Sequence, residues 1–200
     1  MNYRDLIPEA TRGKNTELSA VVDCGTDSNA KKKFELAARR LLAPDTWAGI
    51  SGKPGAEFLA LGSDLQEKPA LIKPGSYIRI DIPGPGPKNG GGYDWVVIQD
   101  LKRKISDNGE DFVGLTVTPC ANPFSTDPSD AHFLEQGSTS TFIILREKKV
   151  VSALYFGRNE KINTAVPGIA DKLRNTVTGL GAFAGLSEAQ WQKLIDGFIS

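Results

Sequence analysis

The stretch "YDWVVIQDLKRKISDNGEDFVGLTVT", residues 93–118, has the pattern of two β-strands joined by a tight turn. Its first part, residues 95–104, begins with a fully apolar run and becomes polar toward its far end. Asn108-Gly109 favours a type I′ hairpin turn, in which both central residues need a positive φ. Residues 112–118 are therefore predicted to form the antiparallel return strand.

Other segments extend this hairpin into a larger sheet. In residues 77–82, three isoleucines alternate with polar residues, as in a strand with one buried face. Residues 57–61 form a shorter candidate strand, and residues 141–146 and 150–156 form a second hairpin that turns near Lys148. The sequence thus predicts an antiparallel meander of about six strands, shaped as a strongly bent sheet or partial β-barrel.

Helical periodicity is confined to the two ends of the chain. Apolar residues recur at helical spacing from Asp27, where Asp27 and Ser28 can cap the helix, to Leu41, and Pro44 stops it. Two C-terminal helices are predicted, one beginning near Pro167 and one over 187–198. The last helix has a capping box of Ser187 and Gln190, a staple of Leu186 and Trp191, and a buried stripe of Trp191, Leu194, Ile195 and Phe198.

The domain organisation follows from these elements. Residues 1–26 lack sustained periodicity and are predicted to be an irregular N-terminal arm. Residues 27–200 are predicted to form a single α+β domain, with one N-terminal helix and two C-terminal helices packed on the apolar face of the antiparallel sheet.

Composition excludes several classes of function. Lys+Arg and Asp+Glu both number 24, so no excess of positive charge favours nucleic acid or an anionic membrane as a partner. The first residues lack the apolar run of a signal peptide, and no stretch is long and apolar enough to span a bilayer. We expect a soluble, cytoplasmic protein, unless a leader has been removed. Cys24 and Cys120 cannot build a disulfide framework or a zinc site alone, and no motif indicates a cofactor or metal.

The predicted meander places its long connections at one end of the sheet. Residues 83–94, 119–140 and 157–164 lie there, opposite the two tight turns. Loops on a rigid sheet often carry function, so this end is the expected working surface. The glycine- and proline-rich loop in 83–94 lacks the Gly-Lys-Ser/Thr motif and following helix of a phosphate-binding loop. It is interpreted as a hairpin loop without a further task or as a lid over a ligand or partner.

Two residues dominate the candidate chemistry. His132 is the only histidine and could act as a general base with Asp130 or Glu135. Arg158 offers a planar fork for a carboxylate or phosphate, or a structural ion pair with Glu160 or Asp94. The candidate ligand- or partner-binding residues are Asp94, Trp95, His132, Arg158, Asn159, Glu160 and Asn163.

These observations favour a non-catalytic binding module that recognises a small ligand or a protein partner through loops at one end of the sheet. Two alternatives stay open. A hydrolase-like enzyme would use His132 with a carboxylate and Arg158, and needs His132, Asp94 and Arg158 to converge in a pocket. A structural subunit of an assembly would instead present a flat apolar patch.

Overall fold

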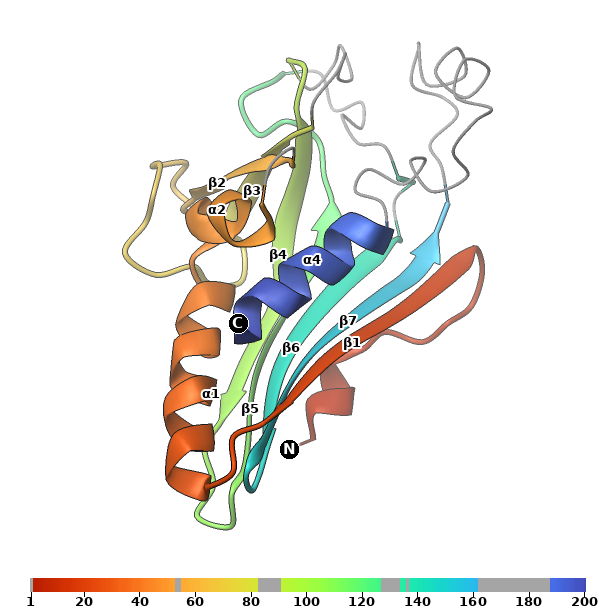
Figure 1. Ribbon diagram of the computed structural model, residues 1–200. Coiled ribbons are helices and arrows are strands. Elements are labelled where there is room, and N and C mark those ends of the chain that lie inside the picture. The colour runs from red at the N-terminus through yellow and green to blue at the C-terminus, as the bar shows by residue number, and fades with distance from the viewer. Residues whose placement is uncertain (1, 53–54, 83–90, 127–133, 136, 162–187) are drawn as a thin grey trace.

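The computed structural model describes residues 2–52, 55–82, 91–126, 134–135, 137–161 and 188–200. They form an α+β fold around one open, seven-stranded antiparallel sheet with the order β1-β7-β6-β5-β4-β3-β2 (Figure 1). The strands are β1 (Lys14–Asp23), β2 (Glu57–Leu61), β3 (Tyr77–Asp81), β4 (Asp94–Lys104), β5 (Glu110–Pro119), β6 (Thr139–Glu147) and β7 (Val150–Glu160). The helices are η1 (Tyr3–Leu6), α1 (Asp27–Leu41), η2 (Pro44–Thr46), α2 (Trp47–Ser51) and α4 (Glu188–Ile199).

The meander predicted from the sequence is confirmed for β2 to β7, where each strand pairs with the next along the chain. The hairpin of β4 and β5 is also confirmed, but its turn is not type I′, because only Gly109 has a positive φ. The sheet is not closed into a barrel. The helix predicted to begin near Pro167 lies outside the described residues.

The N-terminal region is where the prediction was wrong. Residues 14–23 are not irregular, since they form strand β1, which pairs antiparallel with β7 from Lys14↔Glu160 to Asp23↔Val150. The alternation in β1 is weak because its buried face includes a threonine and an alanine, while Val21 on the other face is 64% exposed. Such a strand is recognisable mainly by its partner, which lies far away in the sequence.

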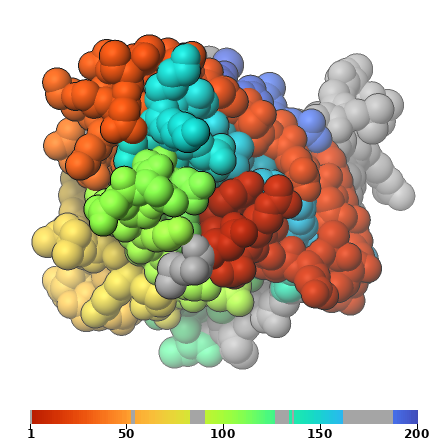
Figure 2. Space-filling model, turned by 90° about the horizontal axis from the view of Figure 1, so that it is seen from below, coloured from red at the N-terminus to blue at the C-terminus, as the bar shows by residue number. Residues whose placement is uncertain are grey.

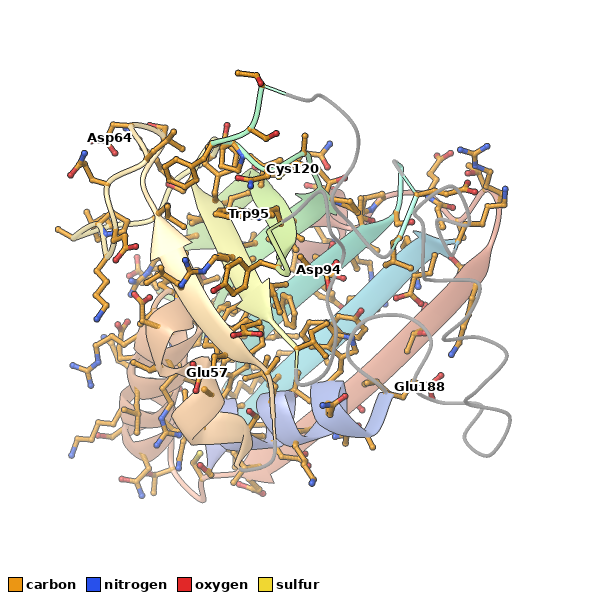
Figure 3. All side chains as sticks on the ribbon, turned by 90° about the horizontal axis from the view of Figure 1, so that it is seen from above. Glu57, Asp64, Asp94, Trp95, Cys120 and Glu188 are labelled. Atoms are coloured by element: carbon orange, nitrogen blue, oxygen red, sulfur yellow. The ribbon has the colours of Figure 1, made fainter. Side chains whose placement is uncertain are left out.

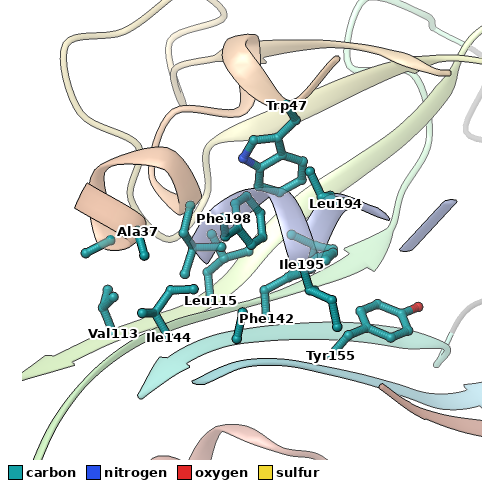
Figure 4. Packing of buried hydrophobic residues seen from close by; sticks show 14 of the residues in the cluster. Ala37, Trp47, Val113, Leu115, Phe142, Ile144, Tyr155, Leu194, Ile195 and Phe198 are labelled. Atoms are coloured by element: carbon teal, nitrogen blue, oxygen red, sulfur yellow. The ribbon is translucent and has the colours of Figure 1, made fainter. Parts of the chain in front are cut away.

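The large core lies on one face of the sheet, here called the inner face, which α1 and α4 cover. Phe142 of β6 packs there with Trp47 and Tyr155 (Figure 4). The ring centroid of Phe142 lies 5.3 Å from those of Trp47 and Trp191 and 5.2 Å from that of Tyr155. Edge-to-face and tilted aromatic contacts of this kind add to the stabilisation from burial.

The two terminal helices largely follow the prediction. In α4, Leu194, Ile195 and Phe198 are buried and Trp191 is half-buried, while the capping box and the staple involve residues outside the described part of the chain. The N-cap of α1 is Thr26, whose hydroxyl accepts a hydrogen bond from the Asn29 amide at 3.2 Å, rather than Asp27 or Ser28.

The opposite face, here called the outer face, has a much smaller cover (Figure 1). Residues 2–13, here called the N-terminal segment, include η1, which places Leu6 over β5. A Cβ at Gly114 would lie 2.8 Å from Leu6 Cδ1, so the missing side chain at Gly114 lets Leu6 approach. Leu6 forms a small cluster with Phe112 and Ile143.

The strand ends next to the long connections do lie at one end of the sheet. Ile80↔Asp94, Val96↔Pro119 and Thr139↔Arg158 are neighbouring pairs there. The prediction that 157–164 is a loop was wrong for Gly157–Glu160, which belong to β7. Most of the glycine-rich loop, Gly90 included, lies outside the described residues. Among the described helices, none has the length and apolar character needed to cross a membrane.

Candidate functional site

Arg158 lies on the outer face near the end of β7. Its Nη2 donates to the carboxylate of Glu17 on β1, and its Nη1 donates to the Gly157 carbonyl oxygen at 3.2 Å. The guanidinium also lies over the ring of Phe156, 5.3 Å from the centroid. The Arg158 side chain is 10% exposed and that of Glu17 is 64% exposed. The ion pair expected for Arg158 therefore exists, but its partner is Glu17 rather than Glu160 or Asp94.

Asn159 directs its neighbours to opposite faces of the sheet. Its φ of +57° accompanies a break in the register between β1 and β7, so Arg158 points outward and Glu160 inward. The Asn159 side-chain oxygen accepts hydrogen bonds from the amides of Thr11 at 2.8 Å and Arg12 at 3.1 Å. Asn159 thus ties the N-terminal segment to the end of β7.

Glu160 belongs to a buried polar network on the inner face. Its carboxylate accepts hydrogen bonds from Thr16 Oγ1 at 3.0 Å and from the Tyr155 hydroxyl at 3.3 Å. Ser140 Oγ lies 3.1 Å from the same tyrosine hydroxyl. A Cβ at Gly157 would lie 2.6 Å from Glu160 Oε1, so this glycine makes room for the carboxylate.

The electrostatics of this network follow from its burial. Burial raises the pKa of Glu160, and the hydrogen bond from Thr16, the charge of Lys14 and the hydrogen bond from Tyr155 oppose that rise. Burial also raises the pKa of Tyr155 far above its usual value, and the neighbouring Glu160 adds to the effect. The network therefore joins β1, β6 and β7 through the Glu160 carboxylate and the Tyr155 hydroxyl.

Asp94 and Trp95 lie elsewhere on the sheet (Figure 3). Trp95 is buried on the outer face beside Leu61, with its ring 5.8 Å from that of Phe124, and Asp94 is also buried. Strand β4, which carries both, is separated from β7 by β5 and β6. Three strand spacings amount to about 14 Å, so the structure does not bring Asp94 next to Arg158. His132 and Asn163 lie outside the described residues.

An open groove on the outer face does contain Arg158. The groove, here called the outer groove, has a volume of about 590 Å³ and runs between the N-terminal segment and strand β1. In the space-filling view these two red segments lie on either side of a narrow strip of β7 (Figure 2). The residues that line the outer groove are Tyr3, Arg4, Ile7, Glu17, Leu18, Ser19, Leu154, Phe156 and Arg158.

Charge in the outer groove is concentrated beside aromatic rings. The guanidinium of Arg4 lies 5.6 Å from the ring centroid of Tyr3 on one wall, as Arg158 lies over Phe156 on the floor. The lining of the outer groove therefore carries two cations and one carboxylate, that of Glu17, which is paired with Arg158. A guanidinium can donate two parallel hydrogen bonds to a carboxylate or phosphate, so this arrangement is suited to holding an anion.

Other chemistry has less support in the described part of the chain. The described residues that line the outer groove include a serine but no histidine or cysteine. No group of three or more histidine, cysteine, aspartate or glutamate residues in the described ranges could hold a metal ion. No disulfide joins Cys24 and Cys120.

Sequence reasoning missed most of the outer groove. Tyr3, Arg4 and Glu17 lie in the region predicted to be an irregular arm, and Phe156 was assigned only to a strand. The alternation of Glu17 and Ser19 with Leu18 and Ala20 was the available signal for β1. No comparable signal showed that β1 would pair with β7.

Comparison with known proteins gives no further guide to function, because the sequence matches no protein-family model and no curated protein.

Proposed function

We propose that this protein is a non-catalytic binding module that holds a small ligand in the outer groove. The observation that carries the proposal is Arg158, a nearly buried cation at the groove whose acidic partner, Glu17, is mostly exposed. A fixed charge beside apolar side chains is the usual composition of a small-molecule site. The volume of about 590 Å³ is also within the usual range of such sites.

The floor and walls of the outer groove are parts of the fold that hold their side chains in defined positions. Its floor and one wall belong to paired strands, β7 and β1, whose backbones are fixed by the sheet. Its other wall is the N-terminal segment, which Asn159 ties down. Sites built on such elements hold side chains more accurately than sites built on loops. The proposal therefore moves the binding surface from the loop end to the outer face, with Arg158 common to both.

Binding is favoured over catalysis by the side chains present. The described lining offers two guanidiniums, an apolar floor and one carboxylate that is already paired with Arg158, and it contains no histidine to activate the serine hydroxyl. The hydrolase alternative depends on His132, which lies outside the described residues, and on Asp94, which lies three strands from Arg158. A concave surface also suits a small ligand better than the flat patch of an assembly subunit.

A fragment screen by two-dimensional amide NMR tests the proposal. We expect hits to shift the amide signals of Tyr3–Ile7 and Leu154–Arg158, since these backbones line the outer groove. Residues 147–150, in the turn between β6 and β7 at the opposite end of the sheet, provide the internal control. A diverse library whose hits all lie away from the groove, or that yields no hits, would contradict the proposal.

A further inference from the structure

We propose that the ligand of the outer groove is a small amphipathic monocarboxylate, whose carboxylate replaces that of Glu17 on Arg158 while its apolar body lies along Phe156 and Leu154. The inference rests on the proposed binding function and specifies the chemical class of the ligand.

The first argument concerns Arg158. Its guanidinium has five N–H groups, and those donated to described residues go to Glu17 and to the Gly157 carbonyl oxygen. The side chain is nearly buried and its stem is held by the sheet, so the charge stays in place when its partner moves. The Arg158 guanidinium is therefore preorganised to bind a carboxylate.

The second argument concerns Glu17, which already shows what Arg158 binds. Its side chain is 64% exposed and reaches Arg158 from an edge strand. Holding a long, solvated side chain in one geometry costs conformational entropy, and exposed acidic partners contribute little net stability. A carboxylate attached to an apolar body can thus displace Glu17 at small cost, because burial of the body supplies the affinity.

The third argument distinguishes a carboxylate from a phosphate. Glu17 remains tethered beside the site after its displacement, so the groove then holds two arginines and one nearby negative charge. The attraction to the arginines and the repulsion from Glu17 both double for a dianion, whereas the cost of removing an ion from water rises with the square of its charge. A monocarboxylate is therefore favoured over a phosphate monoester.

The fourth argument limits the apolar body. Leu154 and Phe156 alternate with inward residues, so they point into the groove on the same side as Arg158. From residue 158 to residue 154 a strand spans about 13 Å. Tyr3 and Ile7 close this strip from the other side. A flexible chain of medium length or a phenylalkyl group fits this strip.

The test compares octanoate with octan-1-ol and octylamine, which share its chain and differ in their head groups. Affinities and shifted amides are measured by NMR titration. We expect octanoate to bind in the outer groove about tenfold more tightly than the alcohol, and the amine to bind most weakly, because hydrogen bonds to a charged group are the strong ones.

Two variants should change the affinity in opposite directions. Glu17→Gln removes the competing carboxylate and should tighten octanoate binding severalfold. Arg158→Gln should weaken it about tenfold or more, and Arg158→Lys should give an intermediate loss because it keeps the charge without the fork. The matched controls are Asp23→Asn and Lys149→Gln, which break an ion pair of 3.1 Å between the last residue of β1 and the residue just before β7, at the opposite end of the sheet. They should leave octanoate affinity unchanged.

The possible failures are distinguishable. Equal binding of octanoate and octan-1-ol in the outer groove, or an unchanged or weaker octanoate affinity in Glu17→Gln, overturns the ligand class and leaves the binding module intact. Absence of octanoate binding to the wild type also overturns the ligand class, and the fragment screen then decides whether the groove binds anything. Glu17→Gln keeps Arg158 and lies on the surface, so its effect is measurable even if Arg158→Gln does not fold.

Discussion

The two faces of the sheet are covered in very different ways. On the inner face, α1 and α4 pack over a continuous aromatic and aliphatic core centred on Phe142. On the outer face, the four-residue helix η1 contributes one buried apolar side chain, that of Leu6. The same strands supply both faces, so the difference lies in the cover. A thick cover stabilises the sheet, and a partial cover leaves the outer groove open over β7 and β1.

The contacts beneath the N-terminal segment are also more polar than those of the core. The Thr116 hydroxyl donates to the Leu6 carbonyl oxygen at 2.9 Å and lies 2.9 Å from the Thr141 hydroxyl, from which it can accept a hydrogen bond. Such hydrogen bonds contribute about 1 kcal/mol each, less than burial of a large apolar side chain. The N-terminal segment is therefore held on the outer face largely by hydrogen bonds, while α1 and α4 are held on the inner face by burial of apolar side chains.

The largest effect is expected from Phe142→Ala on the inner face. Phe142 is in contact with the rings of Trp47, Tyr155 and Trp191 and with helix α4, so its truncation leaves a cavity that rigid neighbours cannot fill. We expect the free energy of unfolding to fall by about 3–5 kcal/mol in urea denaturation. A loss below about 1 kcal/mol would show that the helices are not firmly docked on this face.

Leu6→Ala should cost less, about 2 kcal/mol, the low end for a buried leucine. Leu6 packs from one side, against Phe112 and Ile143, and the N-terminal segment can settle as the cavity forms. Hydrogen exchange should increase mainly in residues 2–13. If Leu6→Ala destabilised the whole protein as much as Phe142→Ala, the distinction between the two faces would be wrong.

The parts of the fold that the sequence predicts are those with strong local periodicity. The β4–β5 hairpin, the strands around it and the buried stripe of α4 each carry their signal within a short window. Strand β1 has few apolar residues of its own, and its identity as a strand depends on β7. Arg158 and Glu17 are 141 residues apart in the sequence, so their pairing is a property of the fold.

The candidate site was predictable in part for the same reason. Arg158 was recognisable as a fixed cation at the end of an apolar strand, and that prediction needed only local pattern. The opposite directions of Arg158 and Glu160 were not recognisable, because regular alternation puts residues two apart on the same face. The positive φ of Asn159 breaks that rule, and an asparagine is among the residues that tolerate it.

Asn159→Gly should have a smaller effect than Leu6→Ala and a more local one. Glycine keeps the φ of +57° without strain, so the variant isolates the side-chain hydrogen bonds to the N-terminal segment. Asn159 Oδ1 accepts from Thr11 and Arg12, and Nδ2 donates to the Glu9 carbonyl oxygen at 3.0 Å. We expect a loss of about 1 kcal/mol and faster amide exchange at residues 11 and 12. Asn159→Asp, which keeps the accepting oxygen, is the matched control and should protect these amides. Exchange that stays slow in Asn159→Gly would mean that other contacts hold the segment.

The smallest effect, and the most specific, is expected from Glu160→Gln on the inner face. Burial raises the pKa of Glu160 in the folded protein, and the hydrogen bond from Thr16, the charge of Lys14 and the hydrogen bond from Tyr155 offset only part of that rise. The folded state therefore binds this proton more tightly than the unfolded chain does. The stabilisation that results is complete below the ordinary pKa of a glutamate and is lost as the pH rises through the raised value.

Glutamine cannot lose a proton, so the unfolding free energy of Glu160→Gln minus that of the wild type should increase across this acidic range and then level off. Urea denaturation of both proteins at a series of pH values measures that difference. A difference that decreases with pH would show that the buried network favours the charged carboxylate, and a constant difference would show that folding does not shift this pKa. Either result contradicts the prediction.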